Sequence, residues 1–163
     1  MKPTLLPVMA LIALFSFSCS TDAIEEDKID VVISNYVPET KSIEVEILDL
    51  INQHRASLSL NRLNSMSEIK AEAYGHTDYM IENNEVSHEF FYQRKANLVS
   101  KVGASKVAEN VAYAFSSPQS VVNAWLNSEG HRDVIEGDYT NFDISAEQND
   151  EGKWYFTNIF LKK

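Results

Sequence analysis

The stretch Trp154-Tyr155-Phe156-Thr157-Asn158-Ile159-Phe160-Leu161, near the end of the chain, decides the fold. In a strand, successive side chains point to opposite faces. One face would carry Trp154, Phe156 and Phe160, and the other would carry Tyr155, Ile159 and Leu161. A strand that is apolar on both faces has to be covered on both faces. The stretch therefore predicts a strand at the centre of a sheet that lies between two other layers.

Hydrophobic periodicity supplies the elements that cover this strand. Apolar residues at three- and four-residue spacing predict helices over 43–58, from Ser65 to about Asn84, over 90–102 and over 117–130, with Ser65 and Glu68 forming a capping box. Strands are expected over 107–114, 142–147 and 153–161, and a turn at 149–152 joins the last two. Because only helices remain to cover the sheet, the predicted fold class is α+β: a three-layer α-β-α sandwich with a central, mainly antiparallel sheet.

Length and charge limit the function. A chain of 163 residues provides enough core for one domain. The formal net charge of -10 repels phosphate backbones, so we expect no nucleic-acid partner. The single cysteine excludes a disulfide within the chain, so the domain depends on its hydrophobic core for stability.

The N-terminal residues are typical of an exported lipoprotein. Residues 1–18 read as a signal peptide: Lys2 is followed by an apolar run over 5–17 that is short for a membrane span. Cys19 stands where cleavage would occur, as in a bacterial lipobox, and a lipid on it would hold the protein on a membrane. Secretion with a free thiol is the alternative.

This interpretation gives a domain plan of signal peptide 1–18, lipidated cysteine and acidic tether 19–42, and folded domain 43–163. The expected location is the bacterial cell envelope, as a lipoprotein anchored to the outer membrane or cell surface.

Short motifs follow one another in a recognisable order between Ile43 and Phe160. They are Asn52-Gln53-His54-Arg55-Ala56, His76-Thr77-Asp78-Tyr79-Met80, Ser87-His88, Glu109-Asn110-Val111-Ala112, Trp125-Leu126-Asn127-Ser128-Glu129-Gly130-His131-Arg132 and the aromatic strand quoted above. In this order they resemble the bacterial branch of the CAP superfamily (SCP-like proteins: cysteine-rich secretory proteins, antigens and pathogenesis-related proteins). The resemblance implies the same three-layer sandwich, with a central polar cleft.

The resemblance also implies a set of cleft residues. His88, Glu109 and His131 match three positions of a cleft that often holds two histidines and two acidic residues; Glu129 lies near the fourth position, and His76 belongs to the bacterial motif. Two departures are expected to reshape the cleft rim. Phe90 replaces a usual glycine, and the family's Gly-Val-Gly strand reads Phe142-Asp143-Ile144-Ser145.

Imidazole and carboxylate groups suit zinc or another divalent ion, so His88, His131 and Glu109 are the expected metal ligands. Two structural roles remain open: His76 as a hydrogen-bonded core residue, and Glu109 as a group that orients a loop through backbone amides.

The expected function is a cell-surface binding module for a lipid, glycan or peptide, with or without a divalent metal. One alternative is a metal-dependent hydrolase in which Glu109 or Glu129 acts as the base. Another is an adhesion or scaffold protein with a vestigial cleft. The sequence does not favour an enzyme.

Overall fold

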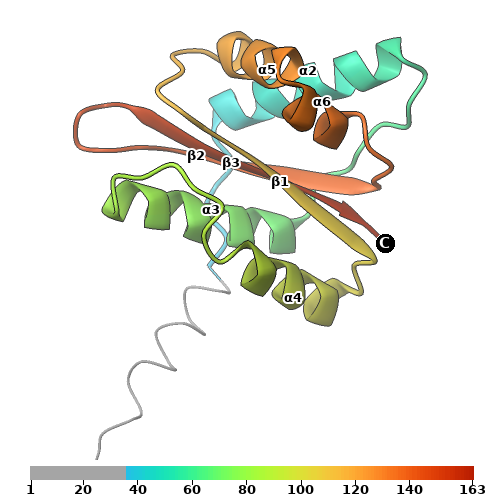
Figure 1. Cartoon of the computed structure of the whole chain (residues 1–163), viewed down its shortest axis with the longest axis horizontal. Helices are drawn as coiled ribbons and strands as arrows, with labels where there is room; N and C mark the ends of the chain where they lie inside the picture. The colour runs from blue at the N-terminus through green and yellow to red at the C-terminus, as the bar shows by residue number, and fades with distance from the viewer. Residues whose placement is uncertain (1–35) are drawn as a thin grey trace, which may run out of the picture.

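The computed structural model describes residues 36–163, which form five helices and three strands (Figure 1). The elements are α2 (Ser42–Ser57), α3 (Ser67–Glu82), α4 (Phe91–Val102), β1 (Lys106–Tyr113), α5 (Pro118–Asn127), α6 (Glu129–Ile135), β2 (Asn141–Gln148) and β3 (Trp154–Lys162). The predicted signal peptide, Cys19 and most of the tether lie outside the described residues.

The three strands form one antiparallel sheet in the order β1-β3-β2. Helices α2, α5 and α6 lie on one face of this sheet, and α3 and α4 lie on the other (Figure 1). The predicted α+β sandwich of three layers is therefore confirmed. Since β3 is central, β1 and β2 are both edge strands, which leaves one side of β1 open for a site.

The two faces of β3 belong to separate hydrophobic clusters, as the alternation in its sequence predicts. Phe156 and Phe160 pack in the cluster that contains Trp125 of α5. On the opposite face, Ile159 packs with Leu98 of α4. All these side chains are almost fully buried, and burying each one contributes about 1.5–3 kcal/mol. The double-sided burial fixes β3 between the layers.

Two helix ends differ from the prediction. Helix α3 begins at Ser67 after Met66, so the expected capping box from Ser65 is wrong. The Met66 amide instead donates to Asp143 Oδ2 at 3.1 Å. The helix expected to run to Gly130 ends at Asn127, and α6 follows it as a separate helix.

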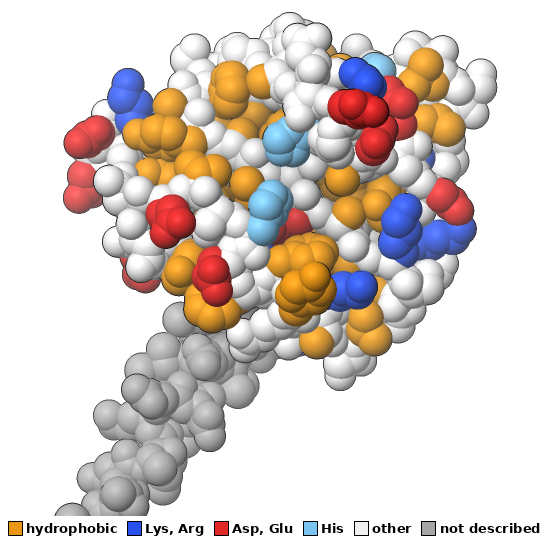
Figure 2. Space-filling view, in the orientation of Figure 1, with side chains coloured by type: hydrophobic (Ala, Val, Ile, Leu, Met, Phe, Trp, Pro, Cys, Tyr) orange, Lys and Arg blue, Asp and Glu red, His pale blue; other side chains and the backbone are white. Residues whose placement is uncertain are grey.

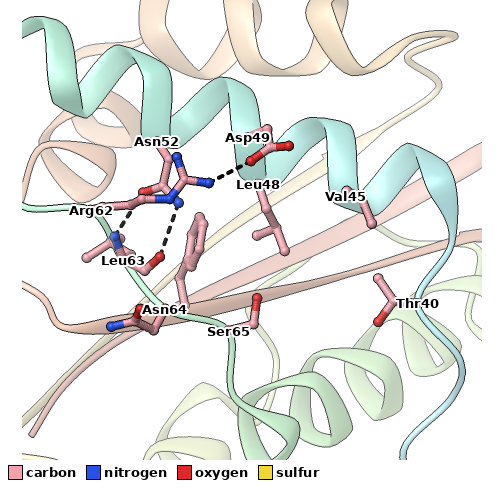
Figure 3. Close-up of a pocket in the computed structure, with 10 residues that line it drawn as sticks. Thr40, Val45, Leu48, Asp49, Asn52, Arg62, Leu63, Asn64 and Ser65 are labelled. Atoms are coloured by element: carbon pink, nitrogen blue, oxygen red, sulfur yellow. Dashed lines mark hydrogen bonds and ion pairs between the residues drawn. The ribbon is translucent and has the colours of Figure 1, made fainter.

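Residues of the first sequence motif hold the layer of α2 and α6 together. The Asn52 side chain exchanges two hydrogen bonds with the Leu63 backbone, at 3.1 and 2.9 Å (Figure 3). Arg55 is fully buried and donates to the carbonyl groups of Ile135 and Gly137 at 2.7 and 2.8 Å. This motif therefore positions the end of α6 rather than lining a cleft.

A buried charged cluster lies under β2. Lys70 Nζ is 2.5 Å from Glu44 Oε1 and donates to the Ile144 carbonyl at 2.8 Å. Burial raises the pKa of nearby Asp143 to about 6. The residues 142–145, which depart from the family pattern, lie on β2 beside this cluster. Since β2 and β1 are at opposite edges of the sheet, this departure does not reshape the rim of a cleft at β1.

Candidate functional site

Glu109 is the centre of the polar site on β1. It is 7% exposed and points toward the layer of α3 and α4. Arg94 of α4 binds its carboxylate with both arms of the guanidinium: Nε donates to Oε2 and a terminal nitrogen donates to Oε1, each at 2.8 Å. Arg94 also donates to the Glu89 carbonyl at 2.7 Å. Such paired, charge-assisted bonds fix the carboxylate in both position and orientation.

His88 lies in the loop between α3 and α4, and its side chain is 52% exposed. Its Nδ1 is 2.9 Å from Glu109 Oε1. Burial raises the pKa of Glu109, but the hydrogen bonds from His88 and Arg94 outweigh that effect and hold it below the usual range. An ionised carboxylate only accepts hydrogen bonds, so His88 Nδ1 must donate, and in the neutral ring Nε2 is then an acceptor.

His76 lies beneath this pair on α3 and is 3% exposed. Its Nε2 is 2.7 Å from the Ser87 carbonyl and 3.9 Å from Glu109 Oε1. Burial lowers the pKa of His76, and the Arg94 charge lowers it further. The neutral ring donates to Ser87 and so positions the residue directly before His88. In the structure, His76 is a buried, hydrogen-bonded residue whose ring lies close to Glu109.

His131 reaches the site from the other layer. It lies on α6, where its Nδ1 is 2.8 Å from the Ser128 hydroxyl. The Asn110 side chain donates to the His131 carbonyl at 3.0 Å, which ties α6 to β1. Burial and the proximity of His88 both lower the pKa of His131. Figure 2 shows two histidine side chains close together on one face, among hydrophobic side chains.

Glu109 and Asn110 are consecutive, so their side chains point to opposite faces of β1. Glu109 holds His88 on the side of α4, while Asn110 holds His131 on the side of α6. The two histidines are therefore brought together across the open edge of the sheet. Glu129, the expected fourth residue, is exposed at the start of α6, and no hydrogen bond joins it to the cleft residues within 36–163.

An apolar hollow of about 320 Å³ adjoins the polar site. Its lining consists of Phe91, Val107, Ala108 and Val134 together with His88 and Glu109. The hollow thus has an aliphatic and aromatic wall and two polar groups at one side. This combination of an apolar surface with few polar groups is typical of sites for small ligands.

A second hollow, of about 290 Å³, lies between α2 and the segment after it (Figure 3). Its polar groups bind one another: Arg62 donates to Asp49 at 2.8 Å, and Asn52 binds the Leu63 backbone. No histidine lines it. This hollow therefore has fewer polar groups that are available to a ligand than the site on β1 has.

The geometry limits how a metal could bind. Both Glu109 oxygens are engaged by Arg94 and His88, and residues 36–163 contain no group of three or more His, Cys, Asp or Glu side chains arranged around a metal. His88 and His131 each use Nδ1 within the protein, so only their Nε2 atoms would be available to a metal. Glu109 fits the role of a carboxylate that orients a histidine ligand.

Arg94 is the residue that sequence reasoning missed. A charged residue on a short helix is normally exposed, and nothing in the spacing links it to Glu109, 15 positions later. One signal was present: Arg94 lies four positions before Leu98, on the face of α4 that is buried.

The sequence is similar to a known family and to two bacterial proteins. A model of the cysteine-rich secretory protein family (CAP) matches residues 48–160. The chain is 33% identical to the uncharacterized membrane protein YlbC of Bacillus subtilis over 126 residues, which are 74% of this chain and 34% of YlbC. It is 27% identical to the uncharacterized protein YkwD of the same organism over 105 residues, which are 62% of this chain and 41% of YkwD. The chain thus spans about a third to two fifths of these relatives.

Solved structures share the fold. An outer surface protein from Borrelia burgdorferi superposes with a TM-score of 0.69 at 22% identity, covering 79% of this chain and 98% of that one. An extracellular protein with an SCP domain from Bacillus anthracis gives a TM-score of 0.65 at 27% identity, covering 77% and 45%. Among the helices of residues 36–163, none combines the length and apolar character of a membrane span. By its sequence match over 48–160 and by its fold, the chain belongs to the cysteine-rich secretory protein (CAP) family.

Proposed function

We propose that this protein is an exported binding module, anchored to a membrane by a lipid on Cys19, whose cleft on β1 takes a small ligand. The observation that carries the proposal is the contact between His88 and Glu109 at the mouth of the apolar hollow. The names of relatives support the location: one is a membrane protein, one an outer surface protein and one an extracellular protein.

The residues that line the cleft favour some ligand classes over others. His88 Nε2 accepts a hydrogen bond from a hydroxyl or amide, while Phe91, Val107 and Val134 contact an apolar group. An acyl chain or an apolar peptide side chain suits this lining better than a glycan, because a glycan would leave polar groups against apolar walls. We therefore favour a lipid or peptide ligand among the three classes that the sequence suggests.

A divalent ion is compatible with the same cleft. His88 and His131 would hold zinc through their Nε2 atoms, with Glu109 keeping the first ring in the right orientation. The ion would then add a Lewis-acid contact for an anionic ligand group. Hydrolysis is less well supported. Glu109 is a poor candidate base because Arg94 and His88 bind both of its oxygens. Glu129 is exposed, and within 36–163 no hydrogen bond joins it to the cleft residues.

Calorimetry on the mature protein tests the cleft. Zinc and short-chain fatty acids are titrated separately into the native protein and into His88→Ala/His131→Ala. The matched control is His54→Ala, which removes a half-buried histidine that pairs with Glu136 away from the cleft. Saturable binding that the double variant loses and the control keeps supports the proposal. Equal binding by all three proteins contradicts it.

The lipid anchor is tested by replacing Cys19 with serine and expressing both proteins in a bacterial host that acylates lipoproteins. The native protein should be found in the membrane fraction and should carry a mass increase equal to its acyl chains. The Cys19→Ser variant should be soluble and unmodified. An unmodified native protein would contradict the anchor but not the cleft.

A further inference from the structure

Exposed apolar side chains are concentrated in the segment that leads into α4 and along α4 itself. Of the nine large hydrophobic residues that are exposed within 36–163, four lie between positions 86 and 99. We call this set the α4 face: Val86 (42% exposed), Phe90 (53%), Tyr92 (83%) and Val99 (44%). Tyr92 and Val99 are seven positions apart, so they form a stripe along one side of the helix. The buried residues Arg94 and Leu98 lie on its opposite side.

The charge pattern of α4 sets it apart from the rest of the chain. The protein has 24 acidic residues, but none lies on α4 between Phe91 and Val102. Lys95 flanks the stripe. Exposed Glu85 and Glu89 adjoin Val86 and Phe90 before the helix, so it is the stripe of Tyr92 and Val99 that lies on a carboxylate-free surface suited to contact an apolar phase.

Phe90 provides an independent observation. Its backbone has φ 58° and ψ 18°, the left-handed conformation, which costs a residue with a side chain roughly 1–2 kcal/mol. Glycine would occupy this position without that cost. The ring touches Tyr79, at 5.3 Å between centroids, yet Phe90 is half exposed. Strain retained at an exposed position is a reason to look for a contact made outside the folded domain.

We propose that the α4 face rests on the lipid bilayer to which the protein is anchored. The place where the tether enters the domain favours this occupant: Tyr36 packs against Tyr74 of α3, at 5.4 Å between ring centroids, in the same layer as α4. From position 36 back to Cys19, 17 residues reach at most about 60 Å, whereas a domain of this size has a radius of gyration of about 14 Å. The tether is therefore long enough for this layer to lie on the membrane.

The contact depends on apolar insertion. With a net charge of -10 the protein is not attracted to anionic lipid, whereas tyrosine, phenylalanine and valine enter the interface of a neutral bilayer. Phe91, next to Phe90 and Tyr92, lines the hollow beside His88. Docking would therefore place the mouth of the cleft close to the lipid surface. This inference rests on the proposed anchor at Cys19.

The experiment uses the mature, acylated protein in phosphatidylcholine vesicles. Acylation blocks Cys19, so Tyr92→Cys provides a single thiol for an environment-sensitive fluorophore. Leu58→Cys, which is also exposed but lies at the end of α2 in the opposite layer, is the matched control. Lipids with a nitroxide near the headgroup should quench the label at position 92 at least threefold more than the label at position 58, equally at 0.05 and 0.5 M salt. Adding Phe90→Gln to the Tyr92→Cys protein should reduce this difference.

Three results would overturn the inference. Equal quenching at the two positions in vesicle-bound protein refutes docking by α4 and leaves the anchor intact. Protein that does not float with the vesicles, or native protein whose Cys19 accepts the label, refutes the anchor and with it the docked state. Shielding of position 92 without vesicles, with a dimer in sedimentation, would show that a second copy covers the face instead.

Discussion

Replacing Arg94 with methionine should lower the free energy of unfolding by about 3–5 kcal/mol at pH 7, because it leaves a buried carboxylate without its counter-charge. The Arg94 side chain is 7% exposed, that of Glu109 is 1% exposed, and three hydrogen bonds from Arg94 are lost together. Methionine keeps much of the apolar stem, so the cost is mainly electrostatic. This is a large part of the total stability of a typical domain, about 5–15 kcal/mol.

Urea unfolding at several pH values measures this loss. With a slope of about 2 kcal/mol per molar urea, the midpoint should fall by about 2 M at pH 7. The loss should become smaller as the pH falls toward 4.5. In the native protein the lowered pKa of Glu109 contributes stability that is present at pH values above its unfolded pKa. In the variant the two Arg94 effects that lower this pKa are lost while burial still raises it, so the carboxyl takes up a proton at a higher pH than in the native protein.

Two further variants test whether the loss of stability comes from the unpaired charge of Glu109. Arg62→Met breaks an exposed pair with Asp49 and should cost at most about 1 kcal/mol. Arg94→Met/Glu109→Gln removes both charges and should recover part of the stability that Arg94→Met loses. If Arg94→Met costs no more than Arg62→Met, or if the double variant is no more stable than the single one, then Arg94 does not hold Glu109 as described.

Two further predictions concern residues outside this pair. Phe90→Gly should be about 1 kcal/mol more stable than Phe90→Ala in thermal unfolding, because glycine relieves the left-handed backbone and alanine does not; the opposite order would show that the backbone there is unstrained. Asp143, whose pKa is raised to about 6 by burial, contributes stability that is present below its unfolded pKa of 3.8 and is lost as the pH rises through 6. Between pH 4 and 7, the unfolding free energy of Asp143→Asn should therefore rise relative to native protein by up to about 3 kcal/mol, and a constant difference across that range would contradict the shift.

The fold was predictable where patterns are local. The alternation within 154–161 correctly predicts a central strand, because burial on two faces is visible in one segment. Helix α6 was missed because it has only 7 residues and its second position, Gly130, looks like a helix end. The start of α3 was misplaced because the Met66 amide is satisfied by Asp143, a partner 77 positions away that no local pattern reveals.

The site was predictable through residue types but not through their arrangement. The motifs point to His88, Glu109 and His131, and the structure places all three at the edge of β1. The hydrogen-bond partner of each site residue depends on contacts between segments that are distant in the sequence. Arg94 engages the carboxylate that the sequence assigns to a metal, and Glu129 is exposed, because the orientation of α6 depends on its packing.

The opposite orientations of Glu109 and Asn110 have a consequence for when the site exists. Each of these neighbours binds a different layer, so the two imidazole rings meet only when both layers are docked on the same edge strand. A partly folded chain with one layer in place keeps one histidine and loses the other. The paired imidazole rings would therefore be the last feature formed during folding and the first lost when either layer detaches.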